Sequence, residues 1–154
     1  MRRLVEGAGL LAAVGAVVAF VGCFMPWAMI ECSSGGGITA ISPNPIWGLA
    51  WDGGKLIVLM VIIVVGLVAA DSNGLRSLRW TGAILASGVA ILALGALNLV
   101  SELDAISHFG ESCVPPNFGS VHVSESIGVG LYLTLVGGVV CTLGGLLQLL
   151  RDRS

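Results

Sequence analysis

Residues 71–79 of this chain read DSNGLRSLR and form a short polar break between two long apolar runs. The segment contains Arg76 and Arg79, two of the seven basic residues in the 154-residue chain. Short connections that carry arginine are retained on the cytoplasmic side of a membrane. These nine residues therefore predict a membrane protein and also the direction in which it is inserted.

The composition agrees with that interpretation. Hydrophobic residues make up 56% of the chain and charged residues 10%, whereas a soluble domain has about 25% charged residues. A helix needs roughly 20 apolar residues to cross the hydrocarbon core of a bilayer. Four segments reach or approach that length: residues 4–30, 56–70, 80–99 and 127–150. We therefore expect an all-α fold, in which residues 1–154 form one domain built as a four-transmembrane-helix bundle.

The charges around these spans predict the orientation. With residues 71–79 in the cytoplasm, all six arginines fall on the inner side against three acidic residues, and Lys55 stands on the outer side against six. This bias predicts cytoplasmic N and C termini and two outer loops, at residues 31–54 and 101–126. The single lysine, with abundant Ala, Gly, Val and Arg, is typical of a high-GC bacterial genome. The expected location is the bacterial plasma (inner) membrane.

The first apolar segment has two further features. Residues 20–23, FVGC, approach the pattern that precedes a lipid-modified cysteine in a secretory signal. The apolar run continues to Ile30, beyond the length of a signal-peptide core, so we expect this segment to be kept as a span. The first outer loop is rich in Gly, Ser and Pro, which favours turns, with a short β-ribbon through residues 38–41 as a further option.

Small residues recur at helical spacing in three of the four spans. The predicted helix-packing residues are Gly15, Gly22, Gly88, Gly95, Gly130, Gly137 and Gly144. Residues seven apart lie on one helical face, and small side chains let helices approach closely in lipid. The first, third and fourth spans are therefore expected to form the packed centre. The bulky segment 56–70 is expected to face lipid or a partner protein.

The four cysteines separate by predicted depth. Cys32 and Cys113 each stand alone in one outer loop, where disulfides persist, so a Cys32–Cys113 bridge is predicted. Free thiols and a bond to another subunit are the alternatives. Cys23 and Cys141 lie at different depths within spans and are expected to stay reduced. A thiol oxidoreductase is disfavoured, because neither loop offers the second thiol that disulfide exchange needs.

Tryptophans fall near both predicted membrane boundaries. Aromatic rings with a polar group favour the headgroup level, so interface anchors are predicted at Trp27, Trp47 and Trp51 on the outer side and at Trp80 on the inner side. Asn98 is the most deeply embedded strong hydrogen-bonding residue, and we expect it to bond between helices.

The remaining polar residues predict no chemistry. Both histidines, His108 and His122, lie in the second outer loop, which disfavours a haem between helices. Together with Glu102, Asp104 and Glu111 they could surround a divalent metal, but their spacing fits no standard motif and favours a solvated acidic loop. The spans contain almost no ionisable residues, which disfavours a transporter. We expect no catalytic residue, no cofactor and no metal, and no nucleic acid as a partner.

The layout resembles that of the claudin-like tetraspan proteins, which have four spans, inner termini and a longer first outer loop with tryptophans. Trp27 and the later segment Gly48-Leu49-Ala50-Trp51 partly match that family's Trp and Gly-Leu-Trp motif. Ala50 interrupts the motif and no cysteine follows Trp51 in this loop, so a barrier role between cells is not inferred. Pro26-Trp27 and Asp52-Gly53 are also similar to small bacterial four-span proteins of unknown function.

These observations lead to one functional expectation and one alternative. The chain is expected to be a non-catalytic accessory subunit that stabilises or positions partners in a larger membrane complex, with respiratory and envelope-building complexes as examples. Its expected partners are membrane lipid and other integral membrane subunits. The alternative is a self-associating, claudin-like tetraspan that forms a homo-oligomer.

Overall fold

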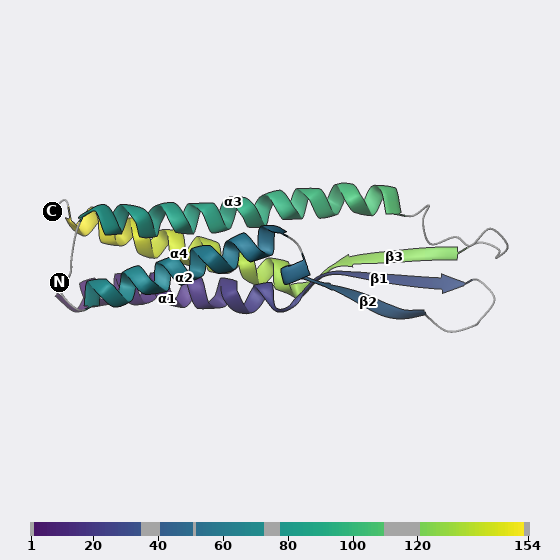
Figure 1. The fold of residues 1–154 in the computed structure, drawn as a ribbon, viewed down its shortest axis with the longest axis horizontal. Helices are drawn as coiled ribbons and strands as arrows, with labels where there is room; N and C mark the ends of the chain where they lie inside the picture. The colour runs from purple at the N-terminus through teal and green to yellow at the C-terminus, as the bar shows by residue number, and fades with distance from the viewer. Residues whose placement is uncertain (1, 35–40, 51, 73–77, 110–120, 153–154) are drawn as a thin grey trace.

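The computed structural model describes residues 2–34, 41–50, 52–72, 78–109 and 121–152. Within these ranges lie the helices α1 (Arg2–Cys23), α2 (Asp52–Ser72), α3 (Leu78–Phe109) and α4 (Val129–Asp152), the strands β1 (Pro26–Ser34), β2 (Ile41–Trp47) and β3 (Val121–Ile127), and the short 3-10 turn η1 (Gly48–Ala50). The helices run side by side, and the strands project from one end of them (Figure 1).

Three of the described helices contain segments that are long and apolar enough to cross a membrane. These segments are Asp52–Ala70, Trp80–Ser101 and Val129–Asp152, whereas the apolar part of α1, Gly7–Cys23, is shorter. The prediction of a membrane protein with transmembrane helices is supported to that extent.

The first helix ends earlier than the end that was predicted from the apolar run. The predicted span reached residue 30, but α1 ends at Cys23 and β1 begins at Pro26. Phe24 donates to the carbonyl of Val21 at 3.0 Å and Met25 to that of Gly22 at 3.2 Å, which closes the last turn. Proline has no amide hydrogen with which to continue the helix. Hydropathy alone does not separate an apolar helix from the apolar strand that follows it.

The third helix continues well past its predicted end at residue 99. It runs to Phe109, so the first nine residues of the predicted outer loop 101–126 are helical. That stretch, SELDAISHF, contains neither proline nor glycine, and the next residue is Gly110. Because polar residues with adequate helix propensity can extend a helix into water, an apolar window marks only the embedded part.

A three-stranded antiparallel sheet contains strands from both the α1–α2 and the α3–α4 connections. The strand order is β2-β1-β3, with β1 paired to β3 from Ala28 opposite Ile127 to Ser34 opposite Val121. The all-α prediction allowed a short ribbon in the first loop, and the sheet is larger than that and includes the second connection. Of the predicted ribbon 38–41, residues 38–40 lie outside the described residues.

Proline limits pairing at one edge of the sheet. Gly128 donates to the carbonyl of Trp27 at 2.6 Å, so the carbonyl of Trp27 points toward the β3 side of β1. Because backbone groups alternate in direction along a strand, the amide and carbonyl of Met29, two residues later, point to the same side. Pro45 lies opposite Met29, so its nitrogen is turned away from β1 and no bond of the ladder is lost. A proline there disfavours a further strand beside β2.

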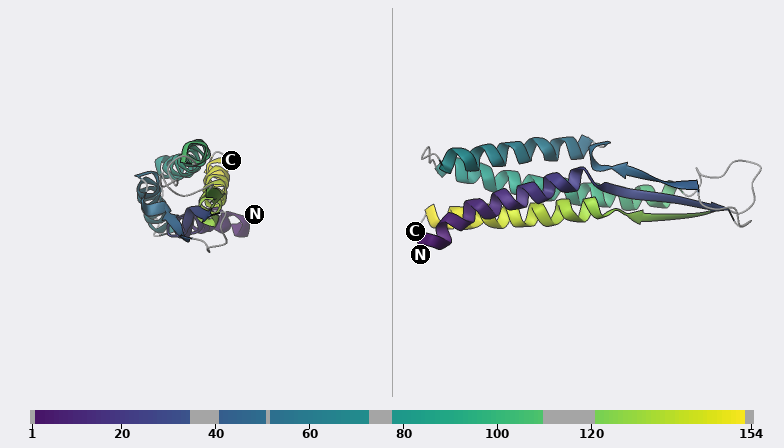
Figure 2. Two further views of the ribbon diagram at one scale, coloured as in Figure 1. Left: turned by 90° about the vertical axis from the view of Figure 1, so that its right-hand side faces the viewer. Right: turned by 90° about the horizontal axis from the view of Figure 1, so that it is seen from below.

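Helix α4 makes the most extensive helix contacts in the bundle. It packs against both α1 and α3, which have few contacts with each other, and α2 completes a ring by packing against α1 and α3. The end-on view in Figure 2 shows this ring. The buried core contains Ala12, Ala16, Ala19, Cys23, Trp27, Ile57, Val61, Val64, Ile84, Ile91, Leu131 and Cys141.

Candidate functional site

The described residues hold no candidate metal centre. No group of three or more His, Cys, Asp or Glu side chains that could bind a metal occurs among them. Glu102, Asp104 and His108 lie on the C-terminal part of α3, and His122 lies on β3, while Glu111 is outside the described residues. The features with defined geometry are instead two close helix contacts and the junction between helices and sheet.

The contact between α1 and α4 has no room for a side chain at its glycine positions. A Cβ atom added to Gly137 would lie 2.6 Å from the carbonyl oxygen of Gly15 and 2.8 Å from the Cα of Ala19. One added to Gly22 would lie 2.7 Å from the carbonyl oxygen of Gly130. Because these neighbours are backbone atoms, they cannot move aside without shifting a helix.

The same contact continues toward the chain termini. A Cβ atom on Gly144 would lie 2.8 Å from the Cα of Ala12. Gly15, Gly22, Gly130, Gly137 and Gly144 of the predicted packing set therefore all lie between α1 and α4. We call this contact the α1–α4 seam.

A second close contact joins α4 to α3. A Cβ added to Gly88 would lie 3.0 Å from the Cα of Thr142, and one added to Gly145 would lie 2.8 Å from the Cα of Leu85. Gly95, also in the predicted set, would meet the Leu135 side chain at 3.0 Å, which is a more adaptable neighbour than backbone. We call this contact the α3–α4 seam.

Adjacent glycines on α4 serve the two seams separately. In the pairs 137–138 and 144–145, the first glycine faces α1 and the second faces α3. Neighbouring residues on a helix point about 100° apart, which matches two partner helices on either side. The Gly-Gly doublets are visible in the sequence, where Gly138 and Gly145 stand beside the sevenfold series of Gly130, Gly137 and Gly144; that each doublet serves two different helices is visible only in the structure.

Thr134 and Asn98 each make a hydrogen bond within their own helix, whereas Thr81 of α3 donates to Asp152 of α4 at 2.7 Å. The hydroxyl of Thr134 donates to the Gly130 carbonyl at 2.9 Å, and Asn98 donates from Nδ2 to the Leu94 carbonyl of its own helix at 2.7 Å. The bond shown for Asn98 within the described residues is thus to its own helix, and its side chain packs against α2, since a Cβ on Gly53 would lie 3.0 Å from the Asn98 Cγ. The bonds of Thr134 and Asn98 are the usual way for a polar side chain to be satisfied within a helix.

The junction between helices and sheet is built around Trp27. Its side chain is 0% exposed, and its Nε1 donates to the carbonyl of Gly22 at 3.0 Å. A Cβ on Gly48 would lie 2.5 Å from the Trp27 Cε2. The indole is therefore enclosed between α1 and η1, and the anchoring role of Trp27 stays a prediction. We call Trp27, Gly48 and Gly128 the outer junction.

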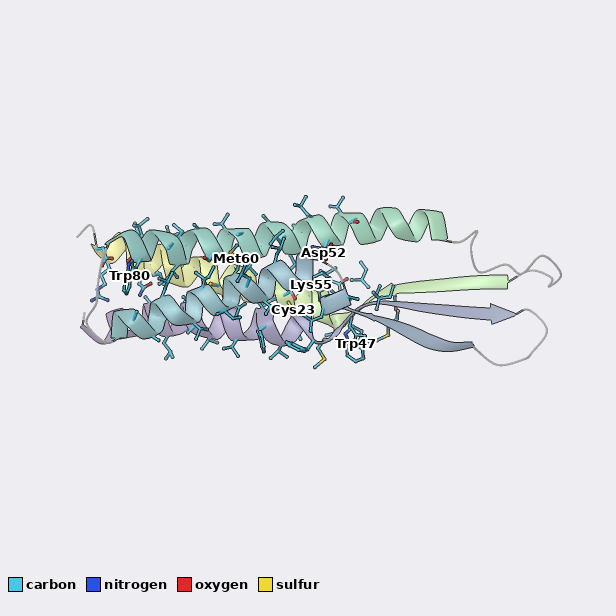
Figure 3. All side chains as sticks on the ribbon, in the orientation of Figure 1. Cys23, Trp47, Asp52, Lys55, Met60 and Trp80 are labelled. Carbon is cyan, nitrogen blue, oxygen red and sulfur yellow. The ribbon has the colours of Figure 1, made fainter. Side chains whose placement is uncertain are left out.

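The other tryptophans are placed differently. Trp47 is 50% exposed and lies at the base of the sheet, whereas Trp80 lies half-buried at the opposite end of the bundle (Figure 3). Trp51 lies outside the described residues. The anchoring roles of Trp47, Trp51 and Trp80 stay predictions.

The cysteines follow the predicted division as far as they are described. Cys23 and Cys141 are buried and free. Cys32 lies in β1, with its Cα opposite Ile41 on one side and Val123 on the other. Cys113 lies outside the described residues, so the Cys32–Cys113 bridge stays a prediction.

Comparisons with known proteins give no family for this chain. No family model matches it, and the search of curated proteins also returned no match. The functional argument therefore depends on the geometry of the seams and the outer junction.

Proposed function

We propose that this chain is a non-catalytic, four-span accessory subunit of a larger membrane complex, which positions partner subunits through its helix faces and its outer sheet. In this proposal it resides in the bacterial plasma membrane, with both termini in the cytoplasm. The proposal assigns the chain a structural role because its close contacts are made by glycine, alanine and threonine, whose side chains supply packing and locally satisfied hydrogen bonds.

The α1–α4 seam supports α1 as the fourth span. Gly22 contacts Gly130 near one end of the seam and Ala12 contacts Gly144 near the other, so α1 runs beside most of the apolar length of α4. A helix that packs this closely along a spanning helix has to share its depth in the bilayer. The opposite face of α1, with Leu10, Val14 and Val17, is exposed and apolar, as a lipid-facing surface requires.

Four spans would account for the clustering of arginines near both chain termini and between α2 and α3, because an even number of spans brings these parts of the chain to one side of the membrane. The beginning of α1, the end of α2, the beginning of α3 and the end of α4 lie at one end of the molecule (Figure 1). These helix ends contain Arg2, Arg3, Arg79 and Arg151, and the other two arginines of the chain follow α2 and α4 in the sequence. The positive-inside rule then places this end in the cytoplasm and the sheet outside.

The observation that carries the accessory role is the rigid link between bundle and sheet. Residues 24–25 alone separate α1 from β1, and Gly128 alone separates β3 from α4. The Gly128 amide bonds to the Trp27 carbonyl, so the two links are bonded to each other. Because α1 and α4 also share a seam, the orientation of the sheet is fixed by the helices. Such a platform suits a protein that holds partners at a set position above the membrane.

A self-associating tetraspan is the second candidate. It is favoured by the union of both outer connections in one sheet, which presents a single outer surface to another copy, and by the resemblance in layout to claudin-like proteins. In that case the partner is the chain itself.

Purification from the native membrane separates these candidates. The full chain, tagged at its C terminus and expressed from its own promoter, is extracted in mild detergent and analysed by size and by mass spectrometry. The accessory role predicts a stoichiometric complex with at least one other integral membrane protein. A homo-oligomer alone would favour the second candidate, and a monomer would contradict both. A Gly66→Ala variant is the matched control, because no atom lies within 4 Å of a Cβ at that position.

A further inference from the structure

Four large apolar side chains are exposed where α1 passes into the sheet. They come from the last turns of α1, the short link that follows it and the end of β2, and they are Phe20, Phe24, Met25 and Trp47, with exposed fractions of 36%, 47%, 39% and 50%. We call this group the aromatic junction surface. It lies next to the outer junction but on the outside of the molecule, where Figure 3 shows Trp47 pointing away from the helices.

The members of this surface are held in fixed positions. The rings of Phe20 and Phe24 lie 4.8 Å apart at an interplanar angle of 55°, a tilted arrangement that aromatic pairs favour. Trp47 lies opposite Pro26 in the sheet, and the amide of Gly48 donates to the carbonyl of Met25 at 3.4 Å. The backbone therefore brings Trp47 beside the end of α1.

The surface continues a row of apolar residues along α1. Exposed side chains follow one another at spacings of three and four, at Leu10, Val14, Val17, Val21 and Phe24. Such spacing keeps them on one helical face. Since this row faces lipid in a spanning α1, the aromatic junction surface is its outer end.

This surface lies near the end of α1 and the beginnings of α2 and α4. Helix α1 ends at Cys23, while α2 begins at Asp52 and α4 at Val129. At the beginning of α2, Asp52 and Lys55 form an exposed ion pair of 2.9 Å, as expected on the polar side of a membrane interface. Tryptophan favours this level because its ring is apolar and its N–H can bond to headgroups or water.

We infer that the aromatic junction surface binds lipid, with Trp47 in the interfacial layer of the outer leaflet and the two phenylalanines in the adjoining acyl region. The base of the sheet then rests on the bilayer. This goes beyond the accessory role, because it assigns this surface to lipid and not to a partner subunit.

Depth-dependent fluorescence quenching tests the assignment in the full-length protein. Two single-tryptophan proteins are reconstituted in phosphatidylcholine vesicles: one keeps Trp47, and its matched control keeps Trp27, which lies close by but is fully buried. Lipids brominated at different depths of the acyl chain should quench Trp47 several-fold more than Trp27, and most strongly when the bromine is near the headgroup. Equal quenching of both residues, or no quenching of Trp47, would overturn the assignment.

Two further measurements keep the test decisive. If replacing Trp27 prevents folding, the wild-type chain is compared with a Trp47→Phe variant. The variant should lose most of the tryptophan fluorescence that shallow bromolipids quench. An unchanged dependence of quenching on bromine depth would refute the lipid contact. The protein-to-lipid ratio is also varied. Quenching of Trp47 that increases strongly on dilution would show that a second copy covers the surface, which would contradict the lipid assignment.

Discussion

At the residue scale, glycine acts here through the absence of a side chain. The seams bring backbone atoms of two helices into direct contact, and dispersion forces between closely packed atoms are the main source of helix association in lipid. Where space is open, as beside Gly66 and Gly82, a glycine makes no such contribution. The position of a glycine, and not its frequency, therefore decides its effect.

The first prediction compares two glycines. Gly137→Ala should lower the free energy of unfolding by about 1–3 kcal/mol, the usual range for overpacking, because the new Cβ would meet the Gly15 carbonyl oxygen at 2.6 Å. Gly66→Ala should leave it unchanged or raise it by up to about 1 kcal/mol. Denaturant titration in mixed micelles measures both. Equal effects of the two substitutions would contradict the α1–α4 seam.

The second prediction compares two tryptophans. Trp27→Ala should destabilise the protein by about 3–5 kcal/mol, as expected for loss of a large buried aromatic side chain. Trp47→Ala should cost much less, since half of that side chain is already exposed. Thermal unfolding in detergent provides the comparison. A larger loss of stability in Trp47→Ala than in Trp27→Ala would contradict the packing of Trp27 in the outer junction.

At the element scale, the β1–β3 ladder decides how the sheet is attached to the helices. The pair formed by Trp27 and Gly128 is hydrogen-bonded, and the register continues without a shift to Ser34 opposite Val121. Alternation along an antiparallel pair then directs the amide of Ser124 toward β1 and that of Val123 away from it.

The third prediction uses this alternation. Ser124→Pro removes an amide that bonds to β1 and should open the sheet, which would increase proteolysis of the outer region while the helices stay protected. Val123→Pro is the matched control, because its amide points away from β1 and the ladder keeps its bonds. Limited proteolysis of vesicles in which the sheet faces outward measures the difference. Greater cleavage of the Val123→Pro protein would contradict the register.

At the scale of the whole molecule, the sheet brings together segments that are far apart in the chain. Cys32 lies opposite Val123, and the chain reaches β3 through the residues that contain Cys113. A bridge between the two cysteines would add a covalent link between connections that are already joined by the ladder, with a contribution of about 4 kcal/mol in the chain-entropy model.

The fourth prediction concerns that bridge. Peptide mapping without reduction should recover a Cys32–Cys113 crosslinked peptide, with Cys23 and Cys141 reduced. Both of these buried thiols should react with a maleimide only after the protein is unfolded, because neither is exposed. Recovery of a Cys23–Cys141 peptide would contradict the structure, and free thiols at Cys32 and Cys113 would remove the proposed bridge while leaving the sheet in place.

The sequence by itself determined the membrane class, the approximate location of four apolar helices and the arrangement of the charges, because apolar length and loop charge are local quantities. It also identified glycines that lie in the seams, since their sevenfold spacing is a helical period. Only the tertiary structure decided that the run ending at Ile30 changes from helix to strand at Pro26, that Trp27 is buried whereas Trp47 is exposed, and that α4 lies between α1 and α3. These features depend on contacts between residues far apart in the chain: β1 is a strand because β2 and β3 bond to it, and the Trp27 indole is enclosed where Gly48, which has no side chain, approaches it closely.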